Sequence, residues 1–385
     1  MRSGRLSTVL AVLVLTCLGG RADAVPTEAE GDPGRTDLPG FRVTTVADGL
    51  AIPWDVQSIG GGRLLFTERD SRSITLIDAD RELHPVEIDN GSLWSSGETG
   101  LMGLEVDPGF DKNRRIYTCS GWTKNDGSHD IRVHAWRLSE DLGSATRTET
   151  LVAGLPTTSG RHGGCRLLVL RDGSLLVGTG DAAQTENPQN RNSLGGKTLR
   201  LDRMTGAPWP RNKWADEKGR QRYVFTYGHR NVQGLAQRAD GTLWSAEHGT
   251  YRDDEINRLG NGRNYGWQPG PGYDESPPMT DFSLPGKQYG ARWSSGEPTI
   301  ATSGATFVAG KEWGVLRGTM AVGVLAGSRL MFVKFSADGK LRWTKAPAAL
   351  KEFGRLRSVT RVGNALLVTT SNGSNDKILR ITPQP

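Results

Sequence analysis

Hydrophobic and polar positions along this chain alternate in short runs separated by glycine-containing turns, and long apolar patterns of helical period are nearly absent. A weak recurrent unit consists of a turn, a short strand of alternating character and a polar loop. Clear copies occupy residues 61–68, 172–179, 240–247 and 362–369, and looser copies occupy residues 115–118 and 317–322. The copies start roughly 45 to 80 residues apart, which is near or above the usual length of one blade in a radially repeated β-protein.

Six copies of one strand-forming unit predict an all-β fold, a six-bladed β-propeller with four-stranded antiparallel blades. One blade cannot bury both of its faces alone, so neighbouring blades have to stack and the ring has to close. We expect the last strand, at residues 377–381, to pair beside early strands and close the ring. A pair of β-sandwiches is the alternative, but it would not explain the repeated Gly-x-Leu-Leu strands.

Composition agrees with one large β-domain. A chain of 385 residues has room for two ordinary domains or one large β-domain, and its 51 glycines favour many short strands with tight turns. The formal net charge is +6. Lysines and arginines are scattered rather than clustered, which indicates a solvated surface and no nucleic-acid partner. A cleft that prefers an anionic ligand is the functional alternative.

The N-terminus has the features of a secretory signal peptide. Arg2 and Arg5 precede an apolar run at residues 9–18, and residues 22–24 offer a small-x-small cleavage site. The run is too short for a membrane span. A lipoprotein site at Cys17 is disfavoured, because the residue before it is not Gly, Ala or Ser. We therefore expect export to the periplasm or the extracellular space.

The predicted organisation has three parts: a signal peptide at 1–24, a disordered leader rich in Pro, Gly and acids at 25–40, and the propeller at 41–385. Export would leave Cys119 and Cys165 in the mature chain. An oxidising compartment permits a disulfide between them, but sequence does not show that they are close. A disulfide and two buried thiols both stay open.

The densest polar chemistry lies at residues 225–267, which include Arg230-Asn231, Glu247-His248-Gly249 and three consecutive acids at 253–255. Loops of this kind on a rigid scaffold usually carry function. Polar residues also follow other repeat strands, at Glu68-Arg69 and Gly180-Asp181. Loops at one end of a propeller channel converge, so we expect these residues to meet in one site.

Three further segments complete the pattern, at residues 98–108, 161–167 and 354–359. Singly, each has an ordinary explanation: a His beside two glycines can cap a turn, and an Arg-x-Arg strand places two side chains on one solvated face. In this order, however, the segments resemble the soluble quinoprotein aldose (glucose/sorbosone) dehydrogenases, six-bladed propellers that bind pyrroloquinoline quinone (PQQ) and calcium. The resemblance runs from about Val43 to Ile381. It is carried by residues 49–55, 98–108, 162–167, 180–181, 195–200, 228–235, 247–249, 254–257, 264–267, 298–304 and 354–357.

The resemblance implies catalytic roles for three side chains. His162 stands where the family's catalytic base stands, and a neutral imidazole suits removal of a sugar hydroxyl proton near neutral pH. Asp181 matches an acid that orients this ring and favours its protonated form. Arg230 matches a residue that contacts the quinone oxygens and stabilises negative charge as hydride arrives.

The resemblance also implies the cofactor contacts. Asn231 and Thr299 match such contacts, and Arg355 and Arg357 match residues whose guanidinium forks suit the carboxylates of a tricarboxylate ligand. Glu98 aligns with a polar residue near the substrate hydroxyl.

Calcium is the metal that the resemblance implies, since it accepts backbone carbonyls as ligands and polarises a quinone as a Lewis acid. The active-site ion would be held by the carbonyls of Gly249 and Thr250. A second, structural ion would be served by Glu255 and the Tyr265 carbonyl, with Asp254 as a further candidate. The ordinary alternative for the three acids is a turn or helix-start cluster.

This chain departs from the family pattern in three places. Thr250 replaces the usual Pro, and Cys165 replaces a small residue beside His162. Ala326 stands where a Lys commonly contacts the cofactor, and Arg329 lies three residues further on. These changes bear on cofactor affinity and substrate preference more than on the fold.

The expected function is an exported oxidoreductase that oxidises the C1 hydroxyl of an aldose to the lactone and passes electrons from PQQ to an external acceptor, as a monomer or homodimer. Three alternatives stay open: a calcium-dependent sugar lactonase, a non-catalytic extracellular ligand-binding propeller, and a quinoprotein acting on a different sugar or alcohol. Both His162 and Arg230 are present, although a non-catalytic propeller would be expected to have lost one of them.

Overall fold

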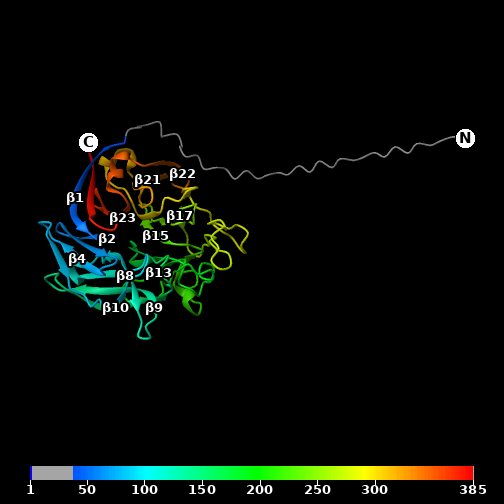
Figure 1. The fold of residues 1–385 in the computed structure, drawn as a ribbon, viewed down its shortest axis with the longest axis horizontal. Coiled ribbons are helices and arrows are strands. Elements are labelled where there is room, and N and C mark those ends of the chain that lie inside the picture. The colour runs from blue at the N-terminus through cyan, green and yellow to red at the C-terminus, as the bar shows by residue number, and fades with distance from the viewer. Residues whose placement is uncertain (2–37, 385) are drawn as a thin grey trace.

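The computed structural model describes Met1 and residues 38–384, in which six antiparallel sheets form a ring (Figure 1). Blade 1 comprises β2 (Pro53–Gly60), β3 (Arg63–Glu68), β4 (Ser73–Ile77) and β5 (Leu83–Val86). Blade 2 comprises β7 (Leu101–Val106), β8 (Arg115–Thr123), β9 (His129–Leu138) and β10 (Ala145–Leu155), with the short β6 (Leu93–Trp94) also paired to β8. Blade 3 comprises β11 (Gly164–Val169), β12 (Ser174–Thr179), β13 (Lys197–Asp202) and β14 (Val224–Tyr227).

The other three blades repeat this plan. Blade 4 comprises β15 (Val232–Gln237), β16 (Leu243–Glu247), β17 (Glu255–Leu259) and β18 (Trp293–Ser294). Blade 5 comprises β19 (Thr302–Phe307), β20 (Met320–Val324), β21 (Arg329–Phe335) and β22 (Leu341–Lys345). Blade 6 comprises β23 (Leu356–Val362), β24 (Ala365–Thr370), β25 (Asp376–Gln384) and β1 (Gly40–Leu50). The predicted six-bladed β-propeller is confirmed.

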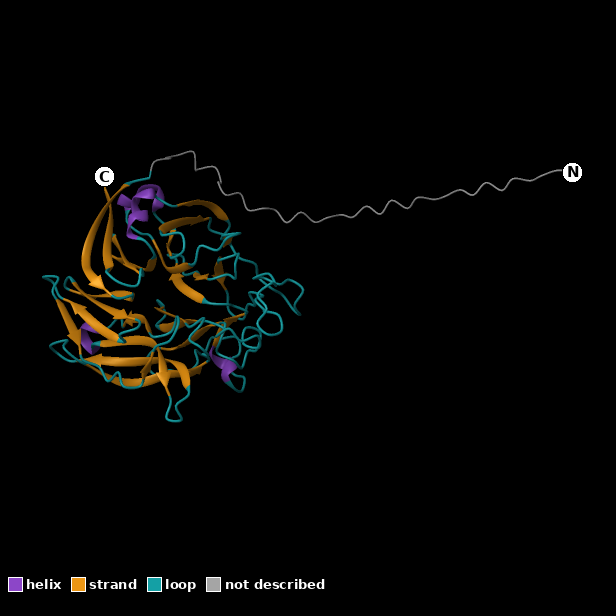
Figure 2. Ribbon diagram, in the orientation of Figure 1, coloured by secondary structure: helices purple, strands orange, loops and turns teal. Residues whose placement is uncertain are grey.

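Helices are few and short (Figure 2). They are α1 (Phe110–Asn113) and the 3₁₀ segments η1 (Arg220–Tyr223), η2 (Lys311–Leu316) and η3 (Ala348–Phe353). No helix within the described part of the chain is long and apolar enough to cross a membrane. Apart from Met1, the predicted signal peptide and the predicted leader up to residue 37 lie outside the described residues.

Each of the six repeat strands recognised in the sequence is the second strand of its blade: β3, β8, β12, β16, β20 and β24. The first strands line the channel, where each contacts the first strand of the next blade around the complete ring. A second strand returns antiparallel to the first, so the residues that follow it lie at the same end of the channel as those that precede the first strand. This geometry brings the segments before β11 and after β12 together.

The ring closes through the two ends of the described chain. Strand β25 pairs antiparallel with β1, with Val43 opposite Ile381 and Ala47 opposite Ile378, and the two strands lie side by side in Figure 1. The expected closure by the last strand is confirmed. The same closure forms a core cluster in which Phe66 of blade 1 packs with residues of blade 6.

The innermost strands approach one another too closely for side chains at some positions. A Cβ atom on Gly103 of β7 would lie 2.2 Å from the carbonyl oxygen of Cys165, and one on Gly234 of β15 would lie 2.3 Å from that of Ser303. Only glycine fits such backbone contacts. The narrow channel therefore depends on glycine at these positions.

Cys119 of β8 and Cys165 of β11 form a disulfide, with their Cα atoms 5.5 Å apart. Both residues are fully buried. The bridge joins blades 2 and 3, so of the two possibilities left open by the sequence the disulfide is the one found. It lies three residues from His162.

Candidate active site

The centre of the site is a buried pair, His162 and Asp181. His162 lies two residues before β11 and Asp181 lies two residues after β12, so the antiparallel pairing of these strands places them together. Nδ1 of His162 is 2.8 Å from Oδ1 of Asp181, and both side chains are almost completely buried. Within the described part of the chain, Nε2 of His162 has no hydrogen-bond partner.

Besides facing Nδ1 of His162, the Asp181 carboxylate accepts hydrogen bonds from three other donors. Oδ2 accepts hydrogen bonds from Trp267 Nε1 at 2.8 Å and from the Tyr273 hydroxyl at 2.7 Å, while Oδ1 accepts one from the Ala183 amide at 2.9 Å. The Tyr273 hydroxyl also lies 3.0 Å from His162 Nδ1. A carboxylate facing Nδ1 favours the tautomer that carries its proton there, which leaves Nε2 as the proton acceptor.

Glu98 and Asn231 connect the histidine segment to two other blades. Glu98 Oε2 accepts hydrogen bonds from the His162 amide at 3.1 Å and from Asn231 Nδ2 at 3.2 Å. Asn231 Oδ1 accepts the amide of Gly164 at 3.1 Å. The structure therefore brings together residues predicted from three separate segments of the sequence.

Arg230 is buried and paired with a residue that the sequence did not single out. Its Nε and Nη2 donate to Oε1 of Glu275 at 3.1 and 2.5 Å, and Oε2 of Glu275 accepts a bond from Arg161 at 2.7 Å. Burial raises the pKa of Glu275, but the two guanidinium groups outweigh it and leave the pKa below its ordinary value. Glu275 is thus an ionised bridge between two arginines.

Arg357 is a buried cation without a carboxylate partner in the described residues. Its Nε donates to Ser371 Oγ at 3.2 Å, and its guanidinium lies 5.6 Å from the Trp54 ring centroid. Burial lowers the pKa of Arg357 to about 9, with further lowering by the charges of Arg69, Arg166 and Arg355.

Such a crowded, dehydrated guanidinium favours an anion beside it. Arg355, two residues earlier on the chain, is exposed and donates to the Ser371 carbonyl at 3.0 Å.

The predicted calcium loop follows β16. Oδ1 of Asp254 accepts the Gly249 amide at 2.9 Å, and Oδ2 accepts the amides of Ile300 and Ala301 at 2.6 Å each. The Thr299 amide donates to the Tyr251 carbonyl at 3.2 Å. Asp254 thus fastens the Gly249 loop to the Thr299 loop, and its role as a calcium ligand stays a prediction.

Two polar atoms in this loop are buried and have no hydrogen-bond partner in the described structure: Nε2 of His248 and Oγ1 of Thr250. Burial and the charges of Arg230 and Arg357 lower the pKa of His248 to about 3, so its ring is neutral near pH 7. Buried polar atoms are normally paired, so these two atoms are available to contact a bound group.

The residues predicted to hold a second ion lie deeper in blade 4. Glu255 accepts hydrogen bonds from Asn257 at 3.1 Å and from Thr280 at 3.2 Å, and burial together with the neighbouring Glu247 raises the pKa of Glu255 to about 8. The Tyr265 ring stacks on His229, with centroids 4.7 Å apart.

The described residues contain no group of three or more His, Cys, Asp or Glu side chains placed to hold a metal. That finding does not test a site made of backbone carbonyls.

Comparison with known proteins decides the family. A family model described as glucose/sorbosone dehydrogenase matches residues 50–380. This chain belongs to the glucose/sorbosone dehydrogenase family.

Aldose sugar dehydrogenase YliI of Escherichia coli is 28% identical over 301 residues, which cover 76% of this chain and 79% of that protein. Two solved structures are also similar along their full length. The PQQ-bound form of aldose sugar dehydrogenase from Streptomyces coelicolor has a TM-score of 0.75 and 28% identity, covering 90% of this chain and 100% of that one. The soluble aldose sugar dehydrogenase of Escherichia coli in its apo form has a TM-score of 0.79 and 26% identity, with the same coverage.

This member of the glucose/sorbosone dehydrogenase family has alanine at position 326, beside the loop that contains Thr299. The Ala326 amide donates to the Ile300 carbonyl at 2.9 Å, so the backbone of Ala326 lies beside the residue that follows Thr299. Arg329 does not substitute for a lysine there in this structure, because its Nε donates to the Gly327 carbonyl at 3.1 Å, within its own hairpin.

Sequence reasoning missed Tyr273 and Glu275 and gave Trp267 no role. Trp267 belongs to the recognised motif at residues 264–267, so the sequence offered a reason to consider it as a site residue. Tyr273 and Glu275 lie in the long connection between β17 and β18, which carries no repeat and no readable code. The position of this connection is set by tertiary contacts, such as the hydrogen bond that the Tyr273 amide donates to Thr185 Oγ1 at 3.1 Å.

Proposed function

We propose that this protein oxidises the C1 hydroxyl of an aldose to the lactone, with PQQ as hydride acceptor, calcium beside it and an external acceptor for the electrons. The observation that carries the proposal is the His162–Asp181 pair, in which a carboxylate holds Nδ1 and leaves Nε2 free. Arg230 and Asn231 belong to the same network of contacts. The family, and the PQQ-bound relative from Streptomyces coelicolor, support this cofactor and substrate class.

His162 supplies the base. Its Nε2 would take the proton of the sugar hydroxyl, and the resulting imidazolium would be stabilised by Asp181 through Nδ1. Because Trp267 and Tyr273 already donate to Asp181, the carboxylate is fixed in orientation before the substrate arrives. The reaction therefore needs no rearrangement of the base.

PQQ, when bound, supplies the hydride acceptor, which no protein side chain can be. The described residues fit this tricarboxylate. Arg357 is a dehydrated guanidinium without a carboxylate partner, and Arg355 exposes a second positive charge near it. These two arginines would hold carboxylates, while Arg230, Asn231 and Thr299 would contact the remaining polar edge.

Glu98, whose Oε2 already contacts the His162 segment, would lie near the substrate hydroxyl.

Calcium fits the loop at Gly249 and Thr250. A side chain on Gly249 would collide with the carbonyl oxygens of Arg252 and Asp253, at 2.1 and 2.4 Å, so the loop is tightly curled around backbone oxygens. The unpaired Thr250 Oγ1 is a further oxygen donor. A hard cation that takes carbonyl and hydroxyl oxygens suits this set. Glu255 and Tyr265 are the proposed ligands of a second, structural calcium.

The cellular site also belongs to the proposal. The sequence of residues 1–24 supports export to the periplasm or extracellular space, where an external acceptor would take electrons from the reduced enzyme. The identity of the sugar rests on the side chains around His162, including Tyr273 and Glu275.

The test is reconstitution of purified apoprotein with PQQ and calcium, followed by dye reduction with a panel of aldoses. We expect dye reduction only when PQQ, calcium and an aldose are all present, and the lactone or its hydrolysis product in the mixture. Failure to bind PQQ contradicts the dehydrogenase. Hydrolysis of sugar lactones by the calcium form without PQQ would identify a lactonase, and ligand binding without turnover would identify a binding propeller.

A further inference from the structure

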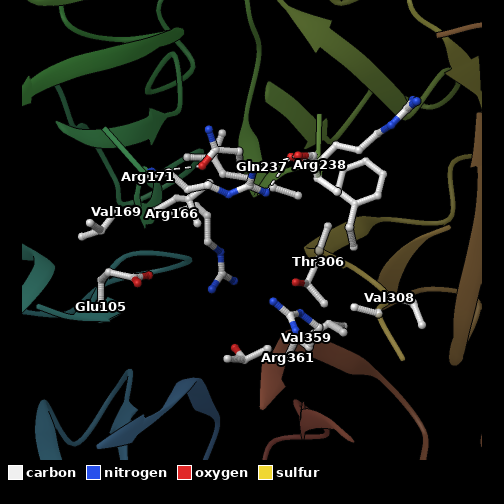
Figure 3. Close-up of a pocket in the computed structure, with 18 of the residues that line it drawn as sticks. Glu105, Arg166, Val169, Arg171, Gln237, Arg238, Thr306, Val308, Val359 and Arg361 are labelled. Atoms are coloured by element: carbon white, nitrogen blue, oxygen red, sulfur yellow. Dashed lines mark hydrogen bonds between the residues drawn. The ribbon is translucent and has the colours of Figure 1, made fainter. Parts of the chain in front are cut away.

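A cavity lies at the end of the central channel opposite to His162. Figure 3 shows residues that line it. Its volume is about 410 Å³. Every innermost strand contributes a residue from its later half: Gln57, Glu105, Val169, Gln237, Phe307 and Arg361. The active-site residues, in contrast, precede these strands or lie at their beginnings, as His162 does for β11 and Arg357 does for β23.

Arg166 stands between the two ends of the channel. Its Nη1 donates to Asp55 Oδ2 at 2.6 Å and its Nε to the Gln233 carbonyl at 2.8 Å, while the guanidinium lies 4.2 Å from the Trp54 ring centroid. Its Nη2 is buried and has no hydrogen-bond partner in the described structure.

Figure 3 shows the Arg166 side chain reaching into the middle of the cavity, between Glu105 and Val359. A buried guanidinium with one unused donor is costly unless a ligand or water accepts that hydrogen bond.

The cavity wall is predominantly positive. Arg171 donates to the carbonyls of Arg238 and Ala239 at 2.8 Å each, which fixes its charge at the wall without neutralising it. Arg361 is exposed, and its side chain has no hydrogen bond or ion pair to another described residue. Arg166 and Arg238 are ion-paired, with Asp55 at 2.6 Å and Asp240 at 3.1 Å, so among the described residues Arg171 and Arg361 supply the positive charge that no carboxylate pairs with.

Glu105 is the carboxylate that lines the cavity among the described residues. Loss of hydration, and secondarily the charge of Asp55, raise the pKa of Glu105 well above its ordinary value. This shift favours the neutral form of the carboxyl, which carries a hydrogen-bond donor instead of a negative charge. Guanidinium groups also outnumber carboxylates among the residues that line the cavity.

We propose that this cavity is a binding site for a small oxyanion, a carboxylate or phosphate group, held between Arg166 and Arg361. Planar guanidinium groups match both oxyanions through paired N–H donors. Val169 and Phe307 line the same space and provide apolar contact for an organic body, and the volume is within the range of small-molecule sites. The site is separate from the proposed cofactor site and does not depend on the oxidoreductase proposal.

Calorimetric titration of the full chain tests the site, with inorganic phosphate and benzoate as separate probes in a non-coordinating buffer of low ionic strength. Wild-type protein should bind at least one probe saturably with a 1:1 ratio. Binding of phosphate alone or benzoate alone identifies which oxyanion the site takes, and absence of saturable binding for both overturns the proposal.

Three variants assign the binding to the cavity. Arg361→Gln should weaken it about tenfold or more, the loss expected for one charge-assisted hydrogen bond. Arg342→Gln, which removes an exposed arginine of β22 that does not line the cavity, should change it less than about twofold. Arg355→Gln should also leave it unchanged, because Arg355 lies at the cofactor end.

Unweakened binding in Arg361→Gln, or equal loss in Arg342→Gln, overturns the proposal. Loss of probe binding in Arg355→Gln alone would place the oxyanion at the cofactor end of the channel. That result also overturns the proposal. Because Arg361 is exposed, its variant should fold, and thermal unfolding of each variant verifies this. No PQQ and no sugar enter the measurement, so its failure and the failure of the proposed function are distinguishable.

Discussion

The carboxylate of Asp181 receives Nδ1 of His162 on one oxygen and the hydroxyl of Tyr273 on the other, at 2.8 and 2.7 Å. The acid is therefore surrounded by donors and has no open position toward a substrate. It orients and supports the imidazole, while the free Nε2 of His162 is the atom that can exchange a proton with a ligand.

His162→Asn is expected to retain PQQ affinity and to lower turnover by about 10² to 10⁴, the usual contribution of a general base. Asn is the better replacement because His162 has a φ of 55°, a left-handed conformation that Asn tolerates. PQQ titration and dye-reduction kinetics measure the two effects. Turnover equal to wild type would remove His162 as the base.

Tyr273→Phe tests the residue that sequence reasoning missed. The change keeps the ring but removes the donor to Asp181 Oδ2, so kcat should fall about five- to tenfold, the equivalent of one hydrogen bond, with PQQ affinity unchanged. Tyr289→Phe is the matched control, because Tyr289 packs on Tyr265 and its hydroxyl has no hydrogen bond in the described structure. Equal kcat in the two variants would show that Tyr273 does not position the pair.

Arg357→Gln should separate cofactor affinity from apoprotein stability. The guanidinium is buried among other arginines and forms no ion pair with a carboxylate of the described residues, so removing its charge should leave the apoprotein as stable as wild type or slightly more stable. PQQ affinity should fall about tenfold or more, because a charge-assisted contact is lost. Thermal unfolding and PQQ titration measure the two quantities.

Arg380→Gln, on the exposed face of β25, is the control for Arg357→Gln and should change neither quantity. A destabilised apoprotein with unaltered PQQ affinity would assign Arg357 to the fold instead of the cofactor site.

The fold was predictable because its signal is local and repeated. The six repeat strands share one environment, the second position of a blade, so burial from both sides imposes a similar apolar strand on each, with the full Gly-x-Leu-Leu pattern in β3 and β12. Closure by residues 377–381 follows from the same logic, since an unpaired edge would remain otherwise.

The site was predictable only where its residues lie in such repeated positions, next to strand ends. Asp254 shows the limit: its role as a calcium ligand stays a prediction, and the amides of residues 300 and 301 that its carboxylate accepts could not be found from the sequence, because they precede the first strand of another blade. Glu275 reaches Arg230 through a long connection whose path depends on tertiary contacts. The disulfide likewise depends on the packing of β8 against β11 rather than on any spacing in sequence.

The disulfide should contribute measurably to stability. Cys119 and Cys165 are 46 residues apart, and closing a loop of this length stabilises a fold by about 2 to 4 kcal/mol through the unfolded state. We expect Cys119→Ala/Cys165→Ala to lose about that much free energy of unfolding in urea. Wild-type protein unfolded with a reductant is the control and should approach the variant; a difference below about 1 kcal/mol between oxidised and reduced protein would contradict the expectation.

Asp107 should make the junction between blades 2 and 3 sensitive to acid. Its Oδ2 accepts hydrogen bonds from the Tyr117 hydroxyl at 2.5 Å and from Arg203 Nε at 2.8 Å, and its Oδ1 accepts two more from Asn113 and Gly109. Burial alone would raise the pKa of Asp107, but these donors outweigh it and lower the pKa to about 2. The folded state therefore holds the ionised form more strongly than the unfolded state does.

The sign of the pH effect follows from that difference. Above the ordinary carboxyl pKa of 3.8 the contribution of Asp107 is complete, and it is lost as the pH falls toward 2, because the unfolded chain takes up the proton first. We expect Asp107→Asn to lose on the order of 1–2 kcal/mol at pH 7, allowing for solvent screening, and to show a shallower decline between pH 4 and 2. Urea unfolding across this range measures both. Asp111→Asn, which changes an exposed acid of α1, should retain the wild-type slope, and the same slope in Asp107→Asn would refute the assignment.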